Sequence, residues 1–127
     1  GEFLIESRCR RTLDGRFLSR SFVASIDGRP VKTGFELIGF DPVSKSVRSW
    51  IFDSNGSFAE GAWTRDGSRW FVRQTGVLAD GQTTSATNTL TKLNDNEFTW
   101  QSVHREAGGK ILPNTNEIMV IRKQDSE

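Results

Sequence analysis

The chain has 127 residues, with 17 basic side chains against 16 acidic ones and a formal net charge of +1. This length is typical of one domain, and the balanced charge gives no electrostatic reason to expect a nucleic acid or an anionic membrane as partner. The sequence has no run of 18 apolar residues that would predict a membrane-spanning helix, and its single cysteine excludes an intrachain disulfide and a cysteine-based metal site.

Tight-turn signals divide the chain into short segments that are rich in β-branched and aromatic residues. Asn, Asp and Gly adopt positive φ at low cost, so pairs of them favour the type I′ turns of β-hairpins. The pairs are Asp14-Gly15, Asp27-Gly28, Asn55-Gly56, Asp66-Gly67 and Asp80-Gly81. Further turn signals are Asp41-Pro42, Asn94-Asp95-Asn96, Gly108-Gly109 and Pro113.

The segments between these turns predict nine strands and no helix. In chain order the strands cover residues 2–12, 16–26, 31–40, 46–53, 57–65, 69–77, 82–93, 97–106 and 114–122. Short connections between long strands predict antiparallel neighbours throughout. We therefore predict an all-β fold, an antiparallel up-and-down meander of about nine strands that forms a closed or half-open barrel. It covers residues 1–127 as a single domain, and its abrupt strand-like start leads us to expect a domain of a longer protein.

Alternation along the strands predicts which side chains face the interior. In most of the predicted strands one face is free of charge, and because burying a lone charge is costly, this face is predicted to point inward. In the second and third strands this face holds Phe17, Ser19, Ser21, Val23, Ser25, Val31, Thr33, Phe35 and Leu37. Such a face mixes rings with polar groups, which favours a cavity for a ligand or water over a dry core. The predicted ligand-binding residues are Ser21, Phe35, Ser49, Trp63, Trp70, Gln74, Trp100, Ser102, His104 and Asn116.

An alternative interpretation places the core on the opposite, charged face of the sheet. That face also carries large apolar side chains, which could pack the interior of a curled sheet. They are Leu18, Phe22, Ile38, Phe40, Trp50 and Phe52.

No group of residues predicts a catalytic site, a metal site or a cofactor. His104 is the only histidine, and without a second histidine or a cysteine cluster it is better explained by ordinary hydrogen bonds than by a role as base or haem ligand. Glu36 and Glu60 could act as paired carboxylates, but a solvated face or cross-strand ion pairs with Arg48 or Arg73 explain them more simply.

Several segments resemble a known family when they are taken in order. They are Asp14 to Leu18, Gly34 to Asp41, Val47 to Ser54, Gly61 and Glu117 to Lys123. This order resembles the bacterial DUF1579 group, which are small calycin-like barrels of unknown function, although Phe40 stands where that group usually has Tyr. The resemblance implies a calycin-like barrel and no assignable catalytic residue. Similar segments follow a SnoaL-like, NTF2-type domain in longer bacterial proteins, which implies such a neighbour here.

These features favour two functions from different classes over a third, an enzyme in its own right. The first is binding of a small apolar or amphipathic molecule inside the barrel. The alternative is a non-catalytic interaction or dimerisation module, here a homodimer, attached to an NTF2-like enzyme domain. An enclosed pocket favours the first, and a large outer apolar patch favours the second.

Overall fold

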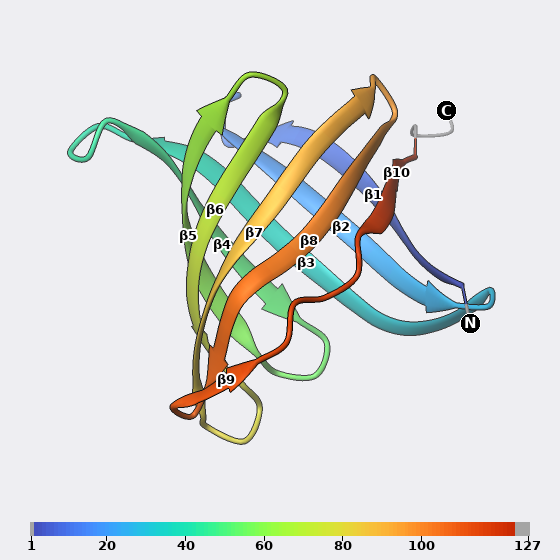
Figure 1. The fold of residues 1–127 in the computed structure, drawn as a ribbon. Coiled ribbons are helices and arrows are strands. Elements are labelled where there is room, and N and C mark those ends of the chain that lie inside the picture. Colours follow the sequence, from blue (N-terminus) through green and yellow to red (C-terminus); the bar gives the residue numbers. More distant parts are fainter. Residues whose placement is uncertain (1, 124–127) are drawn as a thin grey trace.

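Ten strands form one sheet that curls into a closed barrel in the computed structural model, which describes residues 2–123 (Figure 1). No helix occurs in this range, and so none that could span a membrane. The strands are β1 (Phe3–Thr12), β2 (Phe17–Ile26), β3 (Arg29–Asp41), β4 (Ser46–Asp53), β5 (Phe58–Asp66), β6 (Arg69–Val77), β7 (Thr83–Asn94), β8 (Glu97–Ala107), β9 (Lys110–Leu112) and β10 (Ile118–Arg122). The predicted all-β barrel is confirmed.

The barrel closes through β10, which lies between β8 and β1. Its pairing with β8 is antiparallel, but its pairing with β1 is parallel, with Leu4 opposite Met119. The expectation of antiparallel neighbours throughout is wrong at this pair. The nine strands of the closed barrel alternate in direction. Because nine is an odd number, the first and the last strand run the same way, and the rest of the meander provides the long connection that a parallel pair requires.

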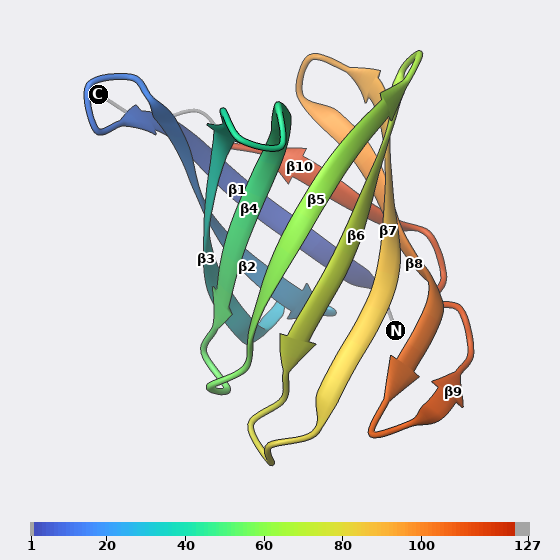
Figure 2. The ribbon, with the colours of Figure 1, turned by 90° about the vertical axis from the view of Figure 1, so that its left-hand side faces the viewer.

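The predicted last strand, 114–122, is shorter than expected. The chain first forms β9 on the edge of β8, then residues 113–117 follow β8 without belonging to a strand (Figure 2). Thr115 connects this segment to β8, because its amide donates to the Ser102 carbonyl over 3.0 Å and its hydroxyl accepts from the Ser102 amide over 2.9 Å. Asn116, the next residue, is exposed and does not line the barrel interior, so the prediction that it faces inward is wrong.

The five Asp-Gly and Asn-Gly pairs all lie at turns, but they use different geometries. At Asp14-Gly15 and at Asp27-Gly28 both residues have positive φ, as a type I′ turn requires. At the other three pairs only the glycine does. Gly67, with φ of 63°, is the first of the two residues between β5 and β6, which is the position that a type II′ turn reserves for glycine.

The strand register places charged residues of β2 and β3 inside the barrel. Leu18, Arg20, Phe22 and Ala24 of β2 face the interior, as do Lys32, Glu36 and Ile38 of β3. The prediction that Ser21, Phe35 and the rest of the uncharged face of these two strands point inward is wrong. Arg20 and Glu36 lie opposite one another and form an ion pair, so neither charge is buried alone. In β4, β5, β6 and the part of β8 up to Ser102 the predicted faces are correct, and they bring Ser49, Trp63, Trp70, Gln74, Trp100 and Ser102 inward.

A bulge in β8 changes the inward-facing parity near its end. Val103 pairs with Thr87 and Glu106 pairs with Ser85, so His104 and Arg105 together oppose Ala86. His104 has a φ of 50° and is exposed, whereas Arg105 and Ala107 turn toward the interior. The prediction that His104 faces inward is wrong for this reason.

Few apolar side chains of the described residues are fully buried. They are Phe22, Ala24, Val72 and Val120, and the buried polar residues are Ser7, Glu36, Ser49, Ser57 and Ser102. A barrel filled by interdigitating side chains would bury many more large apolar groups. The interior is therefore hollow, and the buried residues form its wall.

Candidate functional site: the barrel cavity

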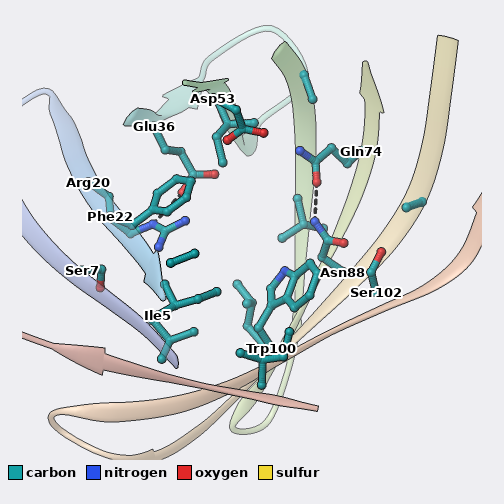
Figure 3. A pocket seen from close by; sticks show the side chains of 18 of the residues that line it. Ile5, Ser7, Arg20, Phe22, Glu36, Asp53, Gln74, Asn88, Trp100 and Ser102 are labelled. Carbon is teal, nitrogen blue, oxygen red and sulfur yellow. Dashed lines mark hydrogen bonds and ion pairs between the residues drawn. The ribbon is translucent and has the colours of Figure 1, made fainter. Parts of the chain in front are cut away.

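A cavity of about 660 Å³ occupies the barrel interior (Figure 3). Every strand of the closed barrel contributes side chains to its lining. Pockets for small molecules span roughly 300–1,000 Å³ and combine apolar walls with a few polar groups. The cavity has the size of such a pocket, and its wall combines apolar side chains with polar and charged ones.

One part of the wall is aromatic and comes from β5, β6 and β8. The rings of Trp63 and Trp70 meet edge to face, with centroids 5.7 Å apart and an interplanar angle of 70°. Trp63 donates its indole N–H to the Ser49 hydroxyl over 2.8 Å. Leu90 is the cross-strand neighbour of both Trp70 and Trp100, so these three form a continuous apolar row.

Two amide side chains lie beside this aromatic surface. The Asn88 side-chain amide donates to the Gln74 carbonyl oxygen (Figure 3). The Gln74 amide nitrogen and the Asn88 carbonyl oxygen make no other hydrogen bond to the described residues. This amide pair therefore keeps one donor group and one acceptor available inside the cavity.

The facing part of the wall, on β2 and β3, carries a partly buried ion pair. Arg20 Nε lies 3.0 Å from Glu36 Oε1, and the two side chains are 18% and 9% exposed. The guanidinium carbon of Arg20 lies 4.9 Å from the centre of the Phe22 ring, a cation–π contact. Of the Arg20 nitrogens, only Nε bonds to the carboxylate, and it does so at Oε1. Within residues 2–123, the two terminal nitrogens of Arg20 have no hydrogen-bond partner, and neither does Glu36 Oε2.

A second ion pair lies near the end of the cavity where β4 ends. Lys32 Nζ is 3.6 Å from Asp53 Oδ2, which also accepts a hydrogen bond from the Ser57 hydroxyl over 3.0 Å. The other carboxylate oxygen, Asp53 Oδ1, is buried and has no hydrogen-bond partner in the described chain. This pair is more exposed than Arg20–Glu36, since the Lys32 side chain is 41% exposed.

Positive and negative charges around the cavity balance. The two interior ion pairs contribute two charges of each sign. The remaining charged lining residues are three cations, Lys92, Arg105 and Arg122, and three anions, Asp95, Glu97 and Glu106. The lining therefore carries no net formal charge.

Cys9 lies on β1 opposite Arg20 and also lines the cavity. Burial raises the pKa of its thiol above the ordinary value of 9.0, although the cations Arg20 and Arg122 oppose this effect. The thiol is thus protonated at neutral pH and behaves as a small apolar group in the wall.

The cavity brings together half of the predicted ligand-binding residues. Trp63, Trp70, Gln74, Trp100 and Ser102 line it, and Ser49 is buried behind Trp63. Ser21, Phe35, His104 and Asn116 are exposed and do not line it. Sequence reasoning missed Arg20, Lys32 and Asp53 as cavity residues, whereas Asn88, which it expects among the polar groups of the interior, does line the cavity. One sequence signal could have identified Arg20. It lies on the same face of its strand as the apolar residues Leu18, Phe22 and Ala24, which indicates that this face points inward.

Glu36 and Glu60 do not form a carboxylate pair. Glu36 faces the cavity, while Glu60 faces outward, where its Oε2 lies 3.5 Å from Arg48 Nη2. Over residues 2–123, no three His, Cys, Asp or Glu side chains cluster in a way that could hold a metal ion.

Comparisons with protein-family models, curated proteins and solved structures find no match for this chain. The closed barrel agrees with the calycin-like architecture that the resemblance implies. Membership of the DUF1579 group and a SnoaL-like neighbouring domain stay predictions.

Proposed function

We propose that the barrel binds a small amphipathic molecule in its cavity, as a calycin-like binding module. The observation that carries this proposal is an interior space of about 660 Å³ with aromatic rings on one part of its wall and unused hydrogen-bonding groups on others. Apolar side chains that line an empty cavity lack dispersion contacts on that side. Water in the cavity can form hydrogen bonds only with the polar groups of the lining. A molecule with an apolar body and a few polar groups would complement both.

Apolar side chains at one end of the cavity provide a route of access. Phe3, Phe58 and Leu78 line the cavity and are 37%, 49% and 37% exposed. They lie at the start of β1, at the start of β5 and just after β6, which meet at one end of the barrel (Figure 2). An apolar molecule would gain contacts with these side chains before it loses its remaining water.

The test uses 4-bromobenzyl alcohol, an uncharged molecule whose bromine quenches tryptophan fluorescence only in contact. The chain provides a control, because Trp63, Trp70 and Trp100 line the cavity while Trp50 does not. We expect quenching that saturates, persists in Trp50→Phe and decreases in Trp100→Phe. Quenching that rises linearly without saturation, or that disappears in Trp50→Phe alone, would overturn the proposal.

A second candidate, self-association, has an observation of its own on the outer surface. Phe35 of β3 and Phe52 of β4 are cross-strand neighbours that face outward, and Phe58 of β5 and Val77 of β6, which also line the cavity, continue this row. The three phenylalanines are 43%, 51% and 49% exposed. A continuous exposed apolar row favours association. A dimer in sedimentation equilibrium that dissociates in Phe52→Ser would support this candidate, and a monomer at all concentrations would exclude it.

A further inference from the structure

Two polar stations face each other across the cavity. The first, the Arg20–Glu36 station, belongs to β2 and β3, and the second, the Gln74–Asn88 station, belongs to β6 and β7. In a closed barrel of nine strands, four steps along the sheet separate β2 from β6 and β3 from β7, so the stations lie on opposite walls (Figure 3). A ligand could therefore be held at two ends at once.

Each station keeps both donors and acceptors for a ligand. The Arg20–Glu36 station has the terminal guanidinium N–H groups and one carboxylate oxygen, and the Gln74–Asn88 station has an amide NH₂ and a carbonyl oxygen. A hydroxyl or a carboxamide can donate and accept at the same time. Once a ligand fills the cavity and excludes water, leaving these groups unpaired is unfavourable, so a ligand that satisfies both kinds binds better than one that satisfies a single kind.

The charges of the cavity select against a charged ligand. Arg20 is already paired with Glu36, and Lys32 is already paired with Asp53. Next to either pair, a carboxylate or an ammonium group would lose its hydration without finding an uncompensated countercharge, and the other six charged lining residues are three of each sign. An uncharged polar group loses far less hydration on entering the same site.

The wall between the stations is suited to a flat apolar body. Trp63, Trp70 and Trp100 present aromatic rings on one side, and Phe22 presents another beside Arg20. Aromatic groups pack against such rings edge to face or in offset stacks. A saturated or branched chain would gain only the non-directional part of this contact.

We propose that the cavity takes an uncharged, flat, largely aromatic or polycyclic molecule with a hydrogen-bonding oxygen or amide group at each end. This inference rests on the proposed function, because it names the ligand class of the same site. One end of the ligand bonds to Arg20 and Glu36, and the other bonds to Gln74 and Asn88. Selection for zero charge is the most distinctive part of the inference.

The experiment compares four biphenyls by titration calorimetry at neutral pH. They are 4′-hydroxybiphenyl-4-carboxamide, the matching 4-carboxylate, the matching 4-aminomethyl ammonium compound, and biphenyl-4-carboxamide without the hydroxyl. We expect the two-ended amide to bind about tenfold or more tightly than each of the other three. Equal or tighter binding of the carboxylate or of the ammonium compound would overturn the inference, and equal binding of the one-ended amide would overturn the two-station part.

Two variants test the charge argument directly, and a third is their control. Glu36→Gln leaves Arg20 unpaired, so the preference should shift toward the carboxylate, and Arg20→Gln should shift it toward the ammonium compound. Glu60→Gln alters an ion pair of the same residue types, Arg48–Glu60, which is more exposed and lies on the outer face, and it should leave the preference unchanged. An equal shift in Glu60→Gln, or no shift in either interior variant, contradicts the inference. If a variant fails to fold, the titrations of the four biphenyls against the native protein still test the charge preference.

The outcome separates this inference from the proposed function. If 4-bromobenzyl alcohol binds in contact with the cavity tryptophans but the biphenyl series shows the wrong charge preference or no binding, the ligand class is wrong and the binding function stands. If neither probe set binds, both fail.

Discussion

Burial controls how the single thiol, Cys9, will react. Its pKa is raised mainly by burial in the cavity wall, so less thiolate is present at a given pH than in free cysteine. We expect Cys9 to react with a disulfide reagent at pH 8 more slowly than free cysteine, and more slowly again when a ligand occupies the cavity. A rate equal to that of free cysteine, unaffected by ligand, would contradict the placement of Cys9.

The same shift affects stability at alkaline pH. The Cys9 thiol has a higher pKa in the folded state than in the unfolded state, where the pKa is about 9.0. Its contribution to stability is therefore complete below the unfolded-state pKa and is lost as the pH rises through the folded-state pKa. Stability should therefore fall above pH 9 by more in the native protein than in Cys9→Ser, as measured by urea unfolding.

His104 illustrates how one residue can store backbone strain. Its φ of 50° is unfavourable for a residue with a side chain, and the bulge that requires it turns Arg105 inward. We expect His104→Val to be less stable than His104→Gly by about 1–3 kcal/mol, because a β-branched residue resists this conformation and glycine does not. Chemical denaturation of the two variants measures the difference, and equal stabilities would argue against the bulge.

The turns are the elements whose chemistry is most specific. A Cβ built on Gly67 would meet no atom within 4 Å, so the effect of a substitution there comes from its φ of 63° alone. Gly67→Val should destabilise the protein by about 1–2 kcal/mol, and Gly67→Asn by less, since Asn tolerates positive φ. An unchanged melting temperature for Gly67→Val would count against the tight turn between β5 and β6.

At the element scale, the limits of sequence reasoning are set by bulges. Turn residues and alternation predicted β1 to β8 and the inward faces of β4, β5, β6 and of β8 up to Ser102, but not β9. The turn at Asp27-Gly28, with Ile26 opposite Arg29, would by itself place Arg20 opposite Phe35. A register shift between Ala24 and Ser25 instead places Arg20 opposite Glu36. A one-residue shift of this kind depends on packing across the closed barrel, so no local pattern shows it.

The molecule as a whole has a large internal surface and few fully buried apolar side chains. Its stability should therefore depend on occupancy of the cavity. At a free concentration of 4′-hydroxybiphenyl-4-carboxamide about 100 times its Kd, folding should gain about 2.7 kcal/mol, with a corresponding rise in melting temperature. Differential scanning calorimetry measures this rise, and a melting temperature that does not change at that concentration would contradict binding to the folded state.

The parallel pairing of β1 with β10 determines how the barrel would respond to mechanical force. The chain enters β1 at one end of the barrel and leaves β10 at the other (Figure 1). Tension on these two points acts along the strands and stretches the bonds between Leu4–Ser7 and Met119–Arg122 together. Tension applied at Phe3 and Ile26, which lie opposite one another on antiparallel strands, would instead open the pair one bond at a time. In single-molecule stretching, the first geometry should require the larger rupture force, so the seam that closes the barrel also makes it resistant to being pulled apart through its backbone.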